Sequence, residues 1–201
     1  RIDRFDYALE IKNSGLSSRP SSWDLDEVNF GAPTITGRLG FRPDAAWKLG
    51  VSGSTGAFIV GDPISQLPAG RERDDFRQDT LGVDVSYAHG HLQLWSELIA
   101  SRFDIPNVGR SGMLSYFVEA KYKVTESLFA ALRWNQQFFE SIANGAGGRT
   151  PWDSEISRVD MAVGFRLNRQ LQFKLQYSVG CDRSPAANGG NLLATQVTWR
   201  F

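Results

Sequence analysis

The sequence alternates between uncharged and charged positions over about ten separate segments, and this period of two constrains the fold more than any other feature. Successive side chains of a β-strand point to opposite faces of a sheet, so this alternation predicts strands with one dry and one wet face. The segments are residues 5–11, 35–41, 47–55, 81–87, 92–100, 114–122, 128–134, 159–167, 171–179 and 193–201. In each segment one parity, here called the uncharged parity, carries apolar or small residues and no ionisable acid or base.

The opposite parity of the same segments, the charged parity, carries acids and bases together with Gly, Ser, Gln and Asn. Its candidate functional residues are Arg38, Lys48, Asp84, Glu97, Glu119, Lys121, Arg133, Asp160, Arg166, Lys174 and Arg200. Over the whole chain, 22 Lys and Arg residues balance 22 Asp and Glu residues. Bulk charge therefore gives no reason to expect a nucleic-acid partner.

Short and long connections alternate along the chain. The short ones are residues 42–46, 88–91, 123–127 and 168–170, and the long polar ones are residues 12–34, 56–79, 102–112, 139–155 and 181–191. This order predicts an up-and-down antiparallel meander. All long loops would lie on one rim of the sheet, and both chain ends on the other.

Two environments could produce such strands. A soluble barrel or sandwich turns its uncharged face inward, whereas a membrane barrel turns it outward to lipid. The strict exclusion of charge, the strand length and the aromatic residues near strand ends favour the membrane. These aromatic residues, expected at the membrane interfaces, are Phe41, Trp47, Tyr87, Tyr122, Trp134, Tyr177, Trp199 and Phe201. We therefore expect residues 1–201 to form a single all-β domain, a transmembrane antiparallel up-and-down β-barrel of about ten strands. A soluble β-barrel that binds an apolar ligand stays as the alternative.

The last strands carry a family resemblance. RVDMAVGFRLNRQLQFKLQYSVG and NLLATQVTWRF resemble the end of bacterial outer-membrane porins, in particular the phosphate-selective porin-like group, and SYFVEAKYKVTESLFAALRW resembles their strand–turn–strand units. The resemblance implies a bacterial outer-membrane location and recognition of Phe201 by the barrel-assembly machinery. It also makes a homotrimer a family expectation.

The number of strands departs from that family, whose members have about sixteen. Two interpretations stay open, a small ten-stranded barrel and the C-terminal part of a larger porin-like chain. The second is favoured because the sequence begins at Arg1 directly before a strand.

Neither a metal nor a catalytic site is expected. His89 and His91 are the two histidines, and no second cluster completes a zinc site around them. Their position on the rim of short turns places them away from the long loops, so an enzyme is not expected. Cys181 is the single cysteine, which excludes an internal disulfide. No cofactor is expected.

The residues of the charged parity are the remaining candidates for a functional role. Basic residues in a narrow lumen attract anions, which predicts passive diffusion of small polar solutes with a weak preference for anions. A long loop, residues 56–79, would constrict the lumen. The alternatives are opposite charges that pair across the lumen as structural struts, and a closed barrel that serves as an anchor, adhesin or assembly partner without a pore.

Overall fold

Ten antiparallel strands form one sheet in the order of the chain, except that two short strands intervene before β10. The computed structural model describes residues 4–12, 33–59, 67–145, 147–180 and 190–200. The sheet contains β1 (Phe5–Lys12), β2 (Thr34–Phe41), β3 (Trp47–Ala57), β4 (Arg77–His89), β5 (Leu92–Ile105), β6 (Gly109–Lys123), β7 (Leu128–Phe139), β10 (Ile156–Arg166), β11 (Leu171–Gly180) and β12 (Leu192–Trp199). The all-β antiparallel meander is therefore confirmed.

Two smaller elements lie at the long-loop rim. A hairpin of β8 (Ser141–Ala143) and β9 (Arg149–Pro151) occupies the connection between β7 and β10, and the 3-10 helix η3 (Arg73–Asp75) precedes β4. No helix in the described ranges is both long and apolar enough to cross a membrane.

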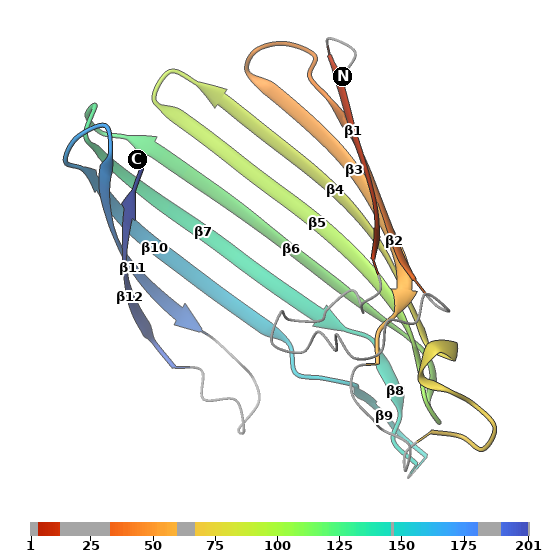
Figure 1. Cartoon of the computed structure of the whole chain (residues 1–201). Coiled ribbons are helices and arrows are strands. Elements are labelled where there is room, and N and C mark those ends of the chain that lie inside the picture. Colours follow the sequence, from red (N-terminus) through yellow and green to blue (C-terminus); the bar gives the residue numbers. More distant parts are fainter. Residues whose placement is uncertain (1–3, 13–32, 60–66, 146, 181–189, 201) are drawn as a thin grey trace.

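The sheet is a curved, open trough (Figure 1). Within the described residues no ladder joins β1 to β12, so these two strands are the edges. The start of β1 and the end of β12 lie on the rim of short turns, as the alternation of short and long connections predicts (Figure 1).

The strand register brings all uncharged-parity segments onto one continuous face. Leu39 pairs with Val51, and Val51 pairs with Val83 in the next ladder. Val118 pairs with Trp134, which in turn pairs with Val159. Because directly opposed residues of an antiparallel pair share a face, the parities that we read separately from each segment describe one surface.

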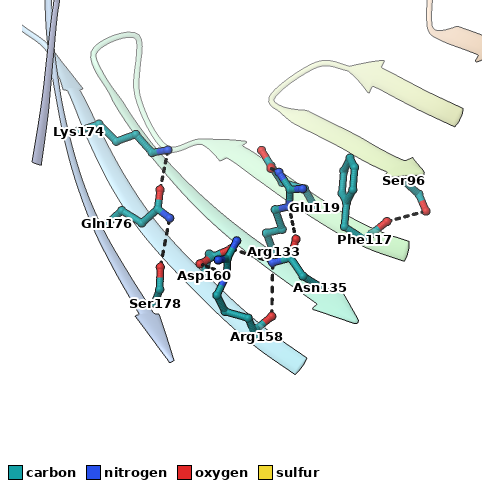
Figure 2. A network of polar contacts seen from close by, with 10 residues as sticks. All are labelled: Ser96, Phe117, Glu119, Arg133, Asn135, Arg158, Asp160, Lys174, Gln176 and Ser178. Atoms are coloured by element: carbon teal, nitrogen blue, oxygen red, sulfur yellow. Dashed lines mark hydrogen bonds and ion pairs between the residues drawn. The ribbon is translucent and has the colours of Figure 1, made fainter. Parts of the chain in front are cut away.

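This uncharged surface is not a packed interior. Leu81, Val118 and Val163 keep 57%, 48% and 51% of their surface exposed. Among the described residues the buried apolar side chains are Phe76, Phe103 and Ala162. A soluble barrel or sandwich with its apolar face inside would bury the first three residues instead. The surface is the convex face of the trough, and the charged parity lies on its concave face (Figure 2).

The expectation of a long loop over residues 102–112 is wrong. β5 continues to Ile105 and β6 begins at Gly109, with Asn107 in the left-handed region at φ 62° in the turn between them. Arg102 and Asp104 are charged although they have the uncharged parity. The alternation therefore stops at Ala100, while backbone pairing continues for several residues beyond it.

Close packing on the concave face leaves no room for a side chain at several glycines, and Gly164 is one of them. A Cβ atom at Gly164 would overlap the ring of Phe129, its cross-strand partner, whereas a Cβ atom at Gly37 would meet nothing within 4 Å.

We expect Gly164→Ala to lower the free energy of unfolding by about 1–3 kcal/mol, the usual cost of overpacking. Gly37→Ala is the matched control and should cause no loss, since its space is open. Equilibrium unfolding in urea measures both. An equal loss in the two variants would contradict the packing described here.

Candidate functional site on the concave face

All the charged-parity candidates lie along the concave face. In the register, Asp84 faces Glu97, and Glu119 faces Arg133, which faces Asp160 in the following ladder. Lys48, Lys121, Arg166 and Lys174 have the same parity on β3, β6, β10 and β11, and Arg200 directly follows β12. The sheet thus brings the candidates onto one surface, and their role as pore-lining residues stays a prediction.

An ion-pair cluster connects the first four strands. Arg38 donates from Nη1 to Asp6 Oδ1 at 3.1 Å and from Nη2 to both carboxylate oxygens of Asp84 at 2.8 Å. Arg42 Nη2 adds a contact to Asp6 Oδ2 at 3.4 Å. Arg38 and Asp84 belong to β2 and β4, so their pair crosses β3. It crosses at Gly50, where a Cβ atom would overlap both side chains.

A second network crosses β6, β7 and β10 (Figure 2). Arg133 Nη1 lies 3.7 Å from Glu119 Oε2, and its Nε donates to Asn135 Oδ1 at 2.7 Å. Asn135 Nδ2 donates to Asp160 Oδ2 at 2.8 Å, and Arg158 Nε lies 3.2 Å from Asp160 Oδ1. Asp160 is buried, and its Oδ2 accepts hydrogen bonds from Asn135 and Arg158, which partly replace its hydration. Its Oδ1 has the Arg158 guanidinium nearby but no hydrogen bond within the described residues.

Side chains two residues apart form a polar ladder along β11. Lys174 Nζ donates to Gln176 Oε1 at 2.9 Å, and Gln176 Nε2 donates to Ser178 Oγ at 3.2 Å (Figure 2). The same strand parity therefore supplies a continuous line of polar groups along the concave face.

Four cations form a basic patch near the short-turn rim: Lys121, Lys123, Arg166 and Lys174. Within the part of the chain that the structure describes, none of them makes an ion pair with a carboxylate. The other three are near enough to Lys121 to repel its charge. A cavity of about 350 Å³ opens there, lined by Lys121, Lys123 and Arg166 together with Glu126 of the turn.

Aromatic rings support the cations of the concave face. Lys121 Nζ lies 4.1 Å from the centre of the Phe129 ring, and the guanidinium carbon of Arg133 lies 3.8 Å from the centre of the Phe117 ring. Such cation–π contacts hold a basic side chain against the sheet without neutralising its charge. These two rings were not among the functional residues predicted from the sequence. Their signal was present, because Phe117 and Phe129 are aromatic residues at the charged parity.

A cluster of aromatic rings occupies the concave face at the long-loop rim. Phe103 lies between Phe58 and Trp152, with ring centres 5.3 and 5.5 Å away, and Phe139 contacts Trp152 at 5.0 Å. Phe58 belongs to the segment expected to constrict the lumen, so part of that segment packs on the concave face. Residues 60–66 of that segment lie outside the described residues.

The predicted interface aromatics share the convex face. Trp47 and Tyr87 contact each other at 4.7 Å, and Phe41 contacts Phe5 at 4.9 Å, both near short turns. Tyr122, Trp134, Tyr177 and Trp199 are exposed on the same face. Phe201 lies outside the described residues. Contact of these rings with membrane interfaces stays a prediction.

The two histidine side chains make separate contacts. The His91 ring nitrogen Nδ1 lies 2.8 Å from the carbonyl oxygen of Lys123, and the His89 ring lies beside that of Tyr87. In the described ranges no three His, Cys, Asp or Glu side chains gather into a group that could hold a metal ion. Cys181 lies outside those ranges.

Comparison with known proteins supports the fold of this sheet. No protein-family model and no curated protein matches the sequence. Among solved structures, an anion-selective porin from Comamonas acidovorans superposes with a TM-score of 0.55 over 84% of this chain, at 12% sequence identity. The chain spans 45% of the length of that porin. This likeness shows that the ten-stranded sheet has a porin-like β-barrel fold.

The coupling free energy between Arg38 and Asp84 in the ion-pair cluster can be measured by a double-mutant cycle. We expect the Arg38→Ala and Asp84→Ala pair to show a coupling of about 1 kcal/mol, because the bidentate geometry is half-buried. The exposed pair Arg71 and Asp75, 3.4 Å apart, is the control and should give less than about 0.5 kcal/mol. Equal coupling free energies for the two pairs would show that burial on the concave face does not strengthen the ion pair.

Proposed function

We propose that this protein is an outer-membrane channel through which small polar solutes diffuse passively, with a weak preference for anions. The unequal distribution of charge on the concave face carries the proposal. Asp6, Asp84, Glu119 and Asp160 are paired with arginines, whereas the basic patch has no carboxylate partner within the described residues. A water-filled lumen lined by this face would keep a net positive potential near the short-turn rim, and such a potential favours anions.

The convex face supports a lipid environment in this proposal. Its exposed apolar side chains would contact hydrocarbon, and the aromatic residues near the short turns would lie at the interface. In lipid the free backbone groups of β1 and β12 require a hydrogen-bonding partner, so a working channel is a closed barrel. Outer-membrane insertion through Phe201 by the barrel-assembly machinery, and assembly into a homotrimer, belong to the same proposal.

A second candidate is a barrel closed by its own side chains that serves as an anchor, adhesin or assembly partner. The aromatic cluster of Phe58, Phe103 and Trp152 favours it, because these rings fill part of the concave face. Conductance separates the two candidates, since a plugged barrel inserts into a bilayer without passing ions.

Removing charge from the basic patch should weaken the anion preference. We expect Lys123→Gln with Lys174→Gln to lower the ratio of anion to cation permeability by about twofold, because two unpaired cations leave the lumen. Reversal potentials across a gradient of potassium chloride in a planar bilayer give this ratio, and a gradient of potassium phosphate gives the same ratio for phosphate.

The control removes two exposed basic residues that lie neither in the basic patch nor in the loop of residues 56–79, Arg110→Gln with Arg149→Gln. It has the same change in net charge and should leave the ratio unchanged. A cation-selective wild-type channel, or an equal shift in both double variants, would refute the anion preference.

A charge on the convex face should destabilise the protein in lipid. We expect Val118→Arg to lower the free energy of unfolding in phospholipid vesicles by about 2–4 kcal/mol, the cost of a cation on the lipid face of a barrel. Ser115→Arg places the same residue on the concave face of the same strand and should cost much less. Equal losses would indicate that lipid does not contact the convex face.

A further inference from the structure

An apolar depression on the convex face lies across β6, β7, β10 and β11, on the side of the short turns. Its volume is about 530 Å³, and its lining includes Tyr122, Ala130, Val163, Leu175 and Tyr177. Ala130 lies opposite Tyr122 in one ladder and opposite Val163 in the next, so its small side chain forms the floor between two larger ones. A depression of this size and lining can accept part of a hydrocarbon chain.

An apolar band connects this depression to the short-turn rim. Phe165 and Phe173 are cross-strand partners on β10 and β11, and they keep 46% and 43% of their surface exposed. From Val163 to Leu167, beyond the end of β10, the chain covers about 13 Å at the usual rise of a strand. This length is within the half-thickness of about 15 Å of a hydrocarbon core. An acyl chain whose glycerol lies at the rim would therefore reach the depression within one leaflet.

Two arginines flank the short turn at the end of this band. Arg169 belongs to the turn between β10 and β11, in which Asn168 Oδ1 accepts hydrogen bonds from the backbone N–H groups of Gln170 and Leu171 at 2.9 and 2.8 Å. The backbone N–H of Arg200 donates to the carbonyl oxygen of Gln170 at 2.8 Å. The end of β12 therefore lies beside the turn that carries Arg169.

The rim at this point is positively charged. Arg166, Arg169 and Arg200 are exposed, and among the described residues none of them makes an ion pair or a side-chain hydrogen bond. Glu126 is the one acidic residue of the two neighbouring turns, residues 123–127 and 167–170. A head group at this rim would meet more cations than anions, which favours a negatively charged one.

We propose that the depression and this rim together bind an anionic glycerophospholipid whose head group carries no ammonium. The phosphate would contact Arg169 and Arg200, and one acyl chain would cross Phe165 and Phe173 to lie over Ala130. Short turns of an outer-membrane barrel face the periplasm, so this rim lies in the leaflet that is built from glycerophospholipids. The site is separate from the solute path, and it rests on the proposed contact of the convex face with lipid.

The arrangement of charges selects among head groups. A phosphatidylglycerol supplies a phosphate for the two guanidinium groups and adds no positive charge, and contacts between arginine and phosphate are among the stronger hydrogen bonds. A phosphatidylethanolamine or a phosphatidylcholine supplies the same phosphate together with an ammonium. The arginines repel that ammonium, and Glu126 is the one carboxylate of the two turns that could compensate it.

Native mass spectrometry of the purified protein in detergent micelles, titrated with each of the three dioleoyl lipids, tests the proposal. We expect phosphatidylglycerol to bind most tightly. Arg169→Gln should weaken phosphatidylglycerol binding by about tenfold, because it removes one charge-assisted contact. Ala130→Phe fills the floor of the depression, keeps every charge and should cause a similar loss. Both variants replace exposed side chains, so neither is expected to disturb folding.

Arg110→Gln is the matched control, since it makes the same change at an exposed arginine of the opposite, long-loop rim. It should bind phosphatidylglycerol as the wild type does. Equal binding of the three lipids, wild-type binding by either Arg169→Gln or Ala130→Phe, or an equal loss in Arg110→Gln would overturn the proposal. If Ala130→Phe instead dissociates an oligomer and leaves lipid binding unchanged, the depression is a contact between copies of the chain. The assay measures lipid and not conductance, so a failed channel assay with intact lipid selectivity refutes the channel alone.

Discussion

Hydrogen bonds between neighbouring strands hold this molecule together, because its described residues contain almost no apolar core. Antiparallel ladders join neighbouring strands, and most of these ladders contain eight or more pairs of residues. The longest ladder joins β5 and β6 and extends from Leu92 to Ile105 of β5. The apolar side chains, which drive folding in water when they are buried, instead cover the convex face. A sheet of this kind needs an apolar surrounding to compensate that exposure. The proposed membrane position supplies it.

The two faces of the sheet have different physical tasks. On the concave face, polar groups pack closely enough that glycine is required where one side chain crosses a strand, as at Gly50 beneath Arg38 and Asp84. On the convex face the apolar side chains are exposed, and some rings contact their cross-strand partners, as Phe5 does with Phe41 and Trp47 with Tyr87. The concave face therefore determines how charge is arranged, and the convex face determines where the sheet can reside.

Charge on the concave face is arranged in two ways, and the difference underlies the proposed selectivity. Arg38, Arg133 and Arg158 take the paired positions. A planar guanidinium can contact a carboxylate through two nitrogens, as Arg38 does with Asp84 through Nε and Nη2. Three lysines and Arg166 take the positions of the basic patch, which have no carboxylate partner within the described residues, and Lys121 lies over the ring of Phe129. Total charge is balanced along the chain, yet its distribution in space is not. Arginines pair with Asp6, Asp84, Glu119 and Asp160, whereas the basic patch has no carboxylate partner within the described residues.

The sequence by itself determined which residues share a face, since the parity of a strand depends only on the alternation of side chains along its backbone. It also determined four of the strand pairs, β2–β3, β4–β5, β6–β7 and β10–β11, because a short turn can join only neighbouring antiparallel strands. The alternation ends at Ala100, so it did not predict the last residues of β5 or the first residues of β6. Backbone pairing continues there because it does not require alternating side chains.

Only the tertiary structure decided which charges meet. The pair of Arg38 and Asp84 depends on the register of two ladders and on the missing side chain at Gly50, and neither can be read from spacing along the chain. The same holds for Arg102. Its cross-strand partner Asp79 accepts a hydrogen bond from Thr55, and within the described residues Arg102 has no carboxylate partner. Parity is a local property of the backbone, whereas contacts between side chains are a property of how strands are aligned.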